Sequence, residues 1–248
     1  MIERSILYFG YLGIITFNSL YSIIRLKANI SDLPYHIIHL GYNAVFIVIL
    51  TITFTGMVIS LELSKEAVRF GVADMVGGGV AIAMAREFGP MLTAIVLIGR
   101  SGSAIAAEIA TMKITDQIDA LRSMGINIYD YIVSPRLIAM VLTEPIITIF
   151  SIISGTFGGA LIANLYANIS YKTYTESIQR FFEYGDLIGG LIKSVFFAVV
   201  IVIVSVVEAL NCPRNSAGVG IAVTNAVMKS IIFIFILNFF FSYLLFAK

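Results

Sequence analysis

Long apolar stretches separated by short polar segments follow one another along almost the whole chain. A transmembrane helix needs about 20 mainly apolar residues, because each residue adds about 1.5 Å and the hydrocarbon layer is about 30 Å thick. Four stretches reach this length with at most two charged residues each: residues 44–63, 137–169, 187–210 and 226–247. This pattern predicts four membrane-spanning helices.

Two further apolar stretches are less uniform. Residues 88–110 are long enough for a fifth span but contain Arg100 and Glu108. Their many Gly, Ala and Ser residues allow close helix packing, so we expect this span to lie inside the bundle. Residues 5–24 carry no charge but include several Gly, Thr, Asn and Ser residues. They are either a sixth span or a helix lying at the membrane interface.

The composition agrees with a membrane protein and excludes several function classes. Apolar residues make up 59% of the 248 residues and charged residues 12%, whereas soluble domains have about 45–50% and about 25%. A net charge of +1 provides no basic surface for nucleic acid. His36 and His39 are too few for a metal site, and no G-x-x-x-x-G-K-[ST] loop is present. We therefore expect no metal, no cofactor and no ATP bound by a phosphate-binding loop of this chain.

The Lys and Arg residues in the loops predict the orientation, because cytoplasmic loops carry an excess of them. With five spans and a cytoplasmic N-terminus, seven basic residues lie on the cytoplasmic side and five on the far side. The cytoplasmic set is Arg4, Arg25, Lys27, Lys113, Arg122, Arg136 and Arg214. This excess favours a cytoplasmic N-terminus.

A short amphipathic segment interrupts the apolar pattern at residues 115–125. Ile114, Ile118 and Leu121 recur at spacings of four and three residues, as on one face of a helix. Gly125 favours the end of that helix. The segment is either a solvated connector between two spans or a functional element.

Ionisable residues inside the apolar stretches are candidate functional residues, because charge is costly within a membrane. They either pair with one another and fix the helix packing, or take part in substrate handling or gating. Arg100 and Glu108 are eight residues apart, or about 80° around a helix, so they could lie towards the same side. The candidates are Arg86, Glu87, Arg100, Glu108, Glu144 and Glu208.

No catalytic set is complete. Residues 99–102 spell G-x-S-G, the nucleophile motif of rhomboid intramembrane proteases. A serine nucleophile needs a histidine base within hydrogen-bond reach, and in those proteases the histidine lies downstream. Both histidines of this chain lie upstream. We therefore expect a protein that is not an enzyme.

The most distinctive stretch, residues 86–136, reads REFGPMLTAIVLIGRSGSAIAAEIATMKITDQIDALRSMGINIYDYIVSPR. It closely resembles the MlaE/YrbE family, the permease subunits of ABC transporters that work with MCE proteins. The family pattern runs R-E-x-G-P, then G-R-x-G-[SA]-A-x-x-A-E, then T-M-x-x-T-[ED]-Q-[IL]-[DS]-A-[LM], then M-G-[IV] and P-R. A second block, residues 191–227, is similar to the family's C-terminal end. Ile221 and Asn225 there replace two arginines that are usual in the family.

The resemblance implies an all-α polytopic membrane protein that forms a homodimer. A single permease domain, residues 1–248, would comprise an interfacial N-terminal region, residues 1–43, and a bundle of about five transmembrane helices, residues 44–247. The segment 115–125 would be a coupling helix that docks into a cleft on a separate ATPase subunit. The docking residues would be Thr115, Asp116, Gln117, Ile118, Asp119, Ala120, Leu121 and Arg122.

The function implied by the resemblance is phospholipid movement between the inner membrane and the outer envelope, which supports outer-membrane lipid asymmetry. An ATPase subunit would supply the energy, and an MCE-domain protein would carry the lipid onward. The start of the chain lacks the Ser- and Arg-rich character of a transit peptide, which favours a bacterial inner membrane.

We make two predictions for the site. The first is a polar framework of Arg86, Glu87, Arg100 and Glu108. The second is a lipid cavity lined by Gly56, Met57, Leu61 and Glu62. The main alternative function is a gradient-driven secondary carrier with Glu87 or Glu108 as a proton-relay carboxylate, although such carriers often contain internal repeats and none is found here.

Overall fold

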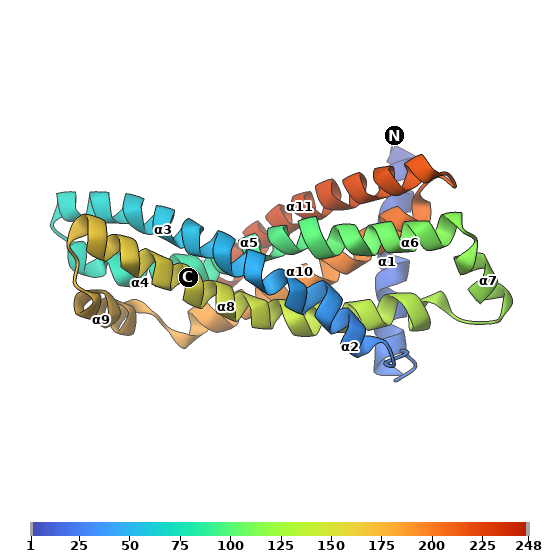
Figure 1. Ribbon diagram of the computed structural model, residues 1–248, viewed down its shortest axis with the longest axis horizontal. Helices are drawn as coiled ribbons and strands as arrows, with labels where there is room; N and C mark the ends of the chain where they lie inside the picture. The colour runs from blue at the N-terminus through green and yellow to red at the C-terminus, as the bar shows by residue number, and fades with distance from the viewer. Residues whose placement is uncertain (1, 247–248) are drawn as a thin grey trace. The chain divides into compact units, whose positions relative to one another are not determined.

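The computed structural model describes residues 2–246, and within this range the chain is helical and contains no strand (Figure 1). The α-helices are α1 Ile2–Ile24, α2 Leu33–His36, α3 Val45–Phe70, α4 Val76–Ala83, α5 Gly89–Leu97, α6 Ser103–Ile114, α7 Gln117–Ser123, α8 Ser134–Ala167, α9 Tyr171–Phe181, α10 Tyr184–Asn211 and α11 Ser216–Phe246. Short π-helical segments (Ile37–Gly41, Met84–Phe88, Ile98–Gly102 and Tyr129–Val133) and 3-10 turns (Tyr42–Ala44 and Ala73–Met75) join several of them. The predicted all-α class is confirmed.

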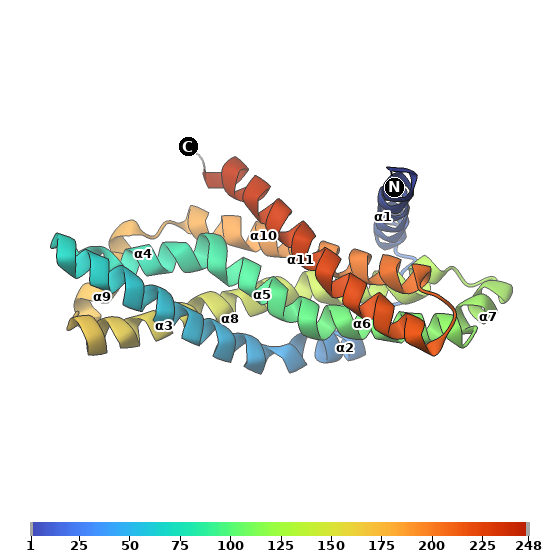
Figure 2. The ribbon, with the colours of Figure 1, turned by 90° about the horizontal axis from the view of Figure 1, so that it is seen from above.

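Six helical stretches of the described chain are long and apolar enough to cross a membrane. They are Ile6–Ile24, Leu33–Phe70, Ala73–Ile114, Tyr129–Ala167, Tyr184–Asn211 and Ser216–Phe246. The last five overlap the predicted spans in the predicted order, although the helix that begins at Tyr129 ends at Ala167 and not at residue 169, and residue 247 lies outside the described residues. Figures 1 and 2 show α1, which holds the first stretch, lying across the direction of α6 and not along it. This course agrees with the interfacial position that the family resemblance implies.

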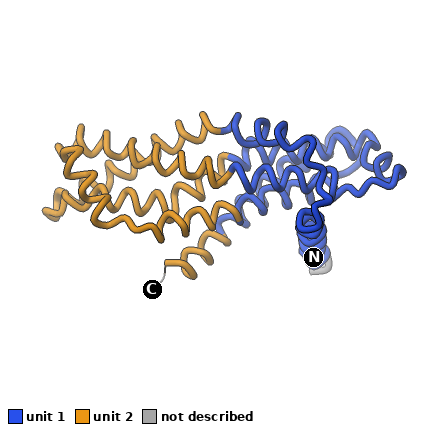
Figure 3. Tube along the Cα trace, turned by 90° about the horizontal axis from the view of Figure 1, so that it is seen from below, with its two compact units in different colours: residues 1–44, 97–143, 196–235 blue, residues 45–96, 144–195, 236–248 orange. Residues whose placement is uncertain are grey.

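The helices group into two compact units, each built from three separate stretches of chain (Figure 3). Unit 1 holds residues 1–44, 97–143 and 196–235, and unit 2 holds residues 45–96, 144–195 and 236–248. Helices α8, α10 and α11 each contribute to both units. The units therefore interleave along the sequence, and no linker separates them.

Small residues allow α3 and α8 to approach closely within unit 2. A Cβ atom on Gly56 would collide with the backbone of Gly155. One turn further along α3, Ser60 Oγ donates to the carbonyl of Gly159 at 2.7 Å. Helices in lipid associate through close packing and hydrogen bonds, because lipid provides no hydrophobic driving force between them. These contacts therefore contribute directly to the stability of the helix pair.

The substitution Gly56→Leu is expected to lower the stability of the protein markedly. The collision would be with backbone atoms, which cannot move aside as a flexible side chain can. Overpacking of this kind costs about 1–3 kcal/mol and sometimes more. Thermal unfolding in detergent would measure the loss, with Gly185→Leu as a control, since a Cβ at Gly185 meets no atom within 4 Å. Equal melting temperatures for the two variants would contradict the prediction.

Helix α9 lies outside the candidate spans and packs against α4. The backbone N–H of Gly78 donates to Ser177 Oγ at 3.0 Å. Tyr174 is buried, and its hydroxyl donates to the carbonyl of Thr156 at 3.2 Å. Burial raises the pKa of the Tyr174 phenol above its usual value. Helix α9 is therefore a packed part of unit 2 and not a loose connection.

Candidate functional site

Unit 2 contains a hydrogen-bonded group of polar side chains within its candidate spans, which we call the Glu87 cluster: Glu87, Lys193, Asn238 and Ser242. The Lys193 side chain on α10 is fully buried, and its Nζ lies 2.9 Å from Glu87 Oε1. The same Nζ donates to Ser242 Oγ and to the carbonyl of Arg86, at 2.7 Å each. Asn238 Nδ2 donates to the other Glu87 oxygen at 2.8 Å. All three ammonium donors are used, so the charge is compensated inside an apolar surrounding.

The local backbone offers the lysine an acceptor. Arg86 and Glu87 lie in the π-helical segment Met84–Phe88, which is followed by Pro90 four residues after Arg86. Proline has no N–H, so Pro90 cannot donate to the carbonyl of Arg86 as an ordinary helical residue would. Lys193 Nζ donates to that carbonyl instead.

Arg86 is next to the Glu87 cluster but pairs with another carboxylate. Its Nε lies 2.6 Å from Asp186 Oδ1, and Asp186 Oδ2 accepts from the backbone N–H of Glu183 at 3.0 Å. The guanidinium carbon of Arg86 and Lys193 Nζ lie 4.8 and 5.2 Å from the centre of the Phe246 ring. The Arg86 side chain is 35% exposed and that of Asp186 only 3%, so Arg86 is the partner that a ligand can reach.

In unit 1, two π-helical segments are joined by side-chain hydrogen bonds. Arg100 Nη1 donates to the carbonyl of His39 at 2.9 Å, and Ser101 Oγ donates to the carbonyl of Leu40 at 2.5 Å. A π-helical turn shifts the backbone hydrogen-bond ladder and occurs often at functional sites. Arg100 and Ser101 therefore hold the segment Ile98–Gly102 against the segment Ile37–Gly41 within unit 1.

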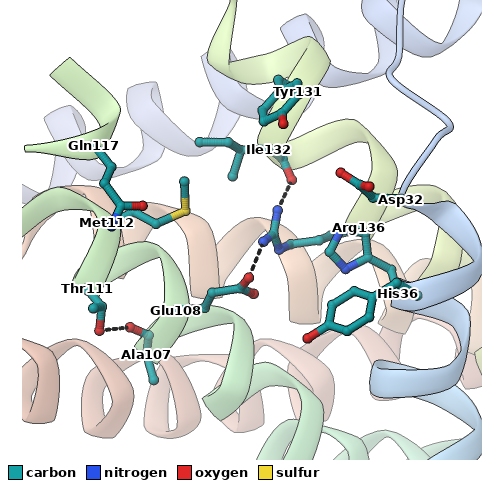
Figure 4. Close-up of a pocket in the computed structure, with 11 residues that line it drawn as sticks. Asp32, His36, Ala107, Glu108, Thr111, Met112, Gln117, Tyr131, Ile132 and Arg136 are labelled. Carbon is teal, nitrogen blue, oxygen red and sulfur yellow. Dashed lines mark hydrogen bonds and ion pairs between the residues drawn. The ribbon is translucent and has the colours of Figure 1, made fainter. Parts of the chain in front are cut away.

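Glu108 pairs with Arg136 and not with Arg100 (Figure 4). Arg136 Nη2 lies 2.8 Å from Glu108 Oε1, and Arg136 Nη1 donates to the carbonyl of Ile132 at 2.6 Å. The Arg136 side chain is 6% exposed and that of Glu108 is 43% exposed. The four residues of the predicted framework thus have partners in two separate units: Arg86 and Glu87 in unit 2, and Arg100 and Glu108 in unit 1.

Sequence reasoning did not select the partners of these residues. Lys193, Asp186 and Arg136 complete the ion pairs of Glu87, Arg86 and Glu108. A signal existed for Lys193, because a lysine within the apolar stretch 187–210 is as costly as the carboxylates that were selected. Asp186 and Arg136 lie just outside the apolar stretches. Charged residues are common at such positions, so these two gave no signal of a functional role.

Two other intramembrane carboxylates differ in their surroundings. Glu208 pairs with Lys229 at 2.7 Å, and Lys229 Nζ lies 4.1 Å from the centre of the Tyr8 ring. Glu144 on α8 is fully buried, and neither of its carboxyl oxygens has a hydrogen-bond partner within residues 2–246.

The four residues proposed to line a lipid cavity lie on α3 in different surroundings. Gly56 is buried against α8, whereas Met57 and Leu61 are partly exposed. Glu62 has a side chain that is 66% exposed, and it pairs with Lys65 at 2.7 Å. Their role in lining a lipid cavity stays a prediction.

The predicted short helix is present as α7, Gln117–Ser123, within residues 115–125. Ile118 is buried, as its place on the apolar face predicts. Asp116 precedes the helix with a φ of +58°, and its side chain makes no capping hydrogen bond. Gly125 follows the helix with a φ of +76°, a conformation that glycine adopts without strain.

Helix α7 and its preceding turn are tied to the loop after α10. Arg214 in that loop lies 2.6 Å from Asp119 Oδ2 and 3.5 Å from Asp116 Oδ1. Lys113 Nζ donates to two carbonyls at and just after the end of α10, at 2.7 and 2.6 Å. A cation at the C-terminal end of a helix also interacts favourably with the helix dipole. We call these contacts the α7 clamp: Lys113, Asp116, Asp119 and Arg214.

Comparison with known proteins places these features in a family. The sequence model of the family described as "Permease MlaE" matches residues 34–244. The chain belongs to the MlaE permease family. It is 38% identical over 206 residues to a probable ABC transporter permease of Synechocystis sp., covering 83% of this chain and 78% of that one. It is 33% identical over 237 residues to a probable ABC transporter permease of Rickettsia typhi, covering 96% and 92%.

A plant relative extends the comparison. The chain is 35% identical over 199 residues to the Arabidopsis thaliana protein TRIGALACTOSYLDIACYLGLYCEROL 1, chloroplastic, covering 80% of this chain and 57% of that one. As an ABC transporter permease, the MlaE protein is a non-catalytic, multi-pass membrane subunit, and its family implies an ATPase partner. Family membership therefore argues against the gradient-driven carrier.

Proposed function

We propose that this MlaE permease moves phospholipids between the bacterial inner membrane and the outer envelope, and so supports the lipid asymmetry of the outer membrane. It works as a homodimer with an ATPase subunit and an MCE-domain protein, and its N-terminus is cytoplasmic. The observation that carries the proposal is the Glu87 cluster with its neighbour Arg86: charged side chains held within apolar spans.

A phospholipid is an amphiphile, so a site that handles it needs charged groups beside apolar surface. Arg86 is partly exposed next to the compensated Glu87–Lys193 pair. Arginine presents donors in a planar fork that matches a phosphate group. Arg86 is therefore the residue that we assign to the headgroup, while Glu87 and Lys193 hold it in place through the shared backbone segment.

The name of the plant relative supports a lipid substrate. It refers to trigalactosyldiacylglycerol, a membrane glycolipid, and that relative is 35% identical to this chain. The α7 clamp supports coupling to an ATPase, because a partner that moves α7 would also pull on the loop between α10 and α11.

Affinity purification in mild detergent, followed by mass spectrometry of the bound proteins and lipids, tests the proposal first. Recovery of an ATPase with a phosphate-binding loop, an MCE-domain protein and phospholipid would support it. Reconstitution of that complex with fluorescent phospholipid then measures ATP-dependent lipid transfer to acceptor vesicles. A preparation without an ATPase partner, or a complex that hydrolyses ATP without moving phospholipid, would overturn it.

A further inference from the structure

Unit 1 contains a polar cavity of about 680 Å³ that the proposed function does not use (Figure 4). Its wall comes from five regions: the N-terminal region around α2, helix α6, helix α7, the π-helical segment Tyr129–Val133 and the start of α8. The lining residues used below are Asp32, Tyr35, His36, Glu108, Gln117 and Arg136. Cavities of about 300–1,000 Å³ are typical of small-ligand sites.

The cavity lies at one end of three long apolar helical stretches. Three candidate spans have their ends there: one begins at Leu33, one ends at Ile114 and one begins at Tyr129. Two tyrosines, Tyr35 and Tyr131, contribute to the lining. Tyrosine is enriched at the level of lipid headgroups. The two tyrosines and the nearby ends of apolar helices favour a ligand of the kind found at the level of lipid headgroups.

The cavity presents charges of both signs. The guanidinium of Arg136 lines the cavity, donates from Nη1 to the Ile132 carbonyl and pairs through Nη2 with Glu108, so that Nη1 and Nη2 each keep a second N–H group. Arginine has five donors, so this side chain can still bind an anion. Glu108 is partly exposed and Asp32 is exposed. Figure 4 shows Asp32 and His36 to one side of Arg136, with Met112 and Gln117 on the other.

We propose that this cavity binds the zwitterionic headgroup of an aminophospholipid, of the phosphatidylethanolamine class. Arg136 binds the phosphate, and Asp32 and Glu108 bind the ammonium. A purely anionic headgroup would place its negative charge beside both carboxylates. Because Gln117 of α7 also lines the cavity, the bound headgroup contacts the helix that we assign to coupling.

The inference rests on the proposed function only in taking a phospholipid as the ligand, and its test needs no transport. The full-length permease is placed in nanodiscs of phosphatidylcholine that contain traces of a photoactivatable phosphatidylethanolamine. After illumination without ATP, labelled peptides are identified by mass spectrometry. Labelling is expected at residues 32–36, 107–117 and 131–136. Unlabelled phosphatidylethanolamine should compete better than phosphatidylglycerol.

Two variants test the assignment of charges. Arg136→Lys is expected to reduce labelling about tenfold, and Asp32→Asn about threefold, since hydrogen bonds to charged groups contribute more when buried than when exposed. Asp32 is exposed, so Asp32→Asn keeps the test valid if the Arg136 variant fails to fold. Asp74→Asn is the matched control, because Asp74 is exposed in unit 2, 4.0 Å from Arg180.

Four outcomes would overturn the proposal. Equal competition by phosphatidylglycerol would indicate a general anion site, and displacement by inorganic phosphate alone would indicate a site for free phosphate. Labelling that disappears when the ATPase subunit is bound would indicate that the cavity wall contacts the ATPase in the complex and does not bind a lipid there. Labelling outside the three segments would place the lipid elsewhere. Lipid transfer can remain intact in each case, so this failure is distinct from failure of the proposed function.

Discussion

The substitution Lys193→Met is expected to reduce ATP-dependent lipid transfer at least tenfold and to lower the melting temperature of the permease. Lys193 Nζ compensates Glu87 and also donates to the Arg86 carbonyl, to which Pro90 cannot donate. Removing one partner of a buried ion pair costs about 3–5 kcal/mol. The Glu87 side chain is 34% exposed, so we expect a smaller loss, about 1–3 kcal/mol. A tenfold loss of rate corresponds to about 1.4 kcal/mol.

The double variant Glu87→Gln/Lys193→Met separates stability from transport. It removes both charges, so its melting temperature should lie above that of Lys193→Met, while lipid transfer stays low. Lys172→Met is the matched control, because the Lys172 side chain on α9 is 85% exposed and lies 3.9 Å from Glu176. If Lys193→Met behaved like Lys172→Met in both measurements, the role assigned to the Glu87 cluster would be wrong.

The substitution Arg214→Asp is expected to uncouple ATP hydrolysis from lipid transfer without unfolding the permease. It would place a third carboxylate beside Asp116 and Asp119, and the repulsion would separate α7 from the loop after α10. All three side chains are at least 42% exposed, so the pairs contribute only about 0–1 kcal/mol each to stability. Coupling energies of about 1–3 kcal/mol change a linked process about 5- to 150-fold. We expect transfer per ATP hydrolysed to fall about tenfold.

The charge swap Asp119→Arg/Arg214→Asp tests the mechanism, since it restores an ion pair across the same gap. Transfer per ATP should recover by at least half of the loss if the clamp itself transmits the motion. Arg69→Asp serves as the control, because Arg69 is exposed at the end of α3, 3.9 Å from Glu66. If Arg214→Asp transported normally, or if the swap gave no recovery, α7 would not act through this clamp.

The helices and their order could be predicted from the sequence because each depends on local composition. Each of the five predicted spans overlaps one observed helical stretch, with ends that agree to within a few residues only in part, and Ile118 is buried as the spacing around α7 predicts. The motifs in residues 86–136 predicted the family that the comparison shows. Local composition did not predict that the side chain of Asp116 pairs with Arg214 and makes no cap to α7.

The candidate site was predictable only in part. The cost of charge in lipid identified Glu87, Arg100 and Glu108 as residues that need partners. Those partners could not be identified from the sequence. The spacing of polar residues along a helix shows which of its faces is polar, but not which other helix packs against that face. Glu87 and Lys193 are 106 residues apart, and Arg86 and Asp186 are 100 residues apart.

By itself, the sequence determined the lipid environment, the helical class, the order of the spans, the short helix α7 and the family of this protein. These properties follow from the residue composition and from the spacing of apolar residues, which can be read from short segments of the sequence. Only the tertiary structure decided that the charges form separate groups in two units, and that Glu108 meets Arg136 at a polar cavity. Such pairings depend on which distant helices pack together, and close backbone approaches such as that of Gly56 to Gly155 set this packing.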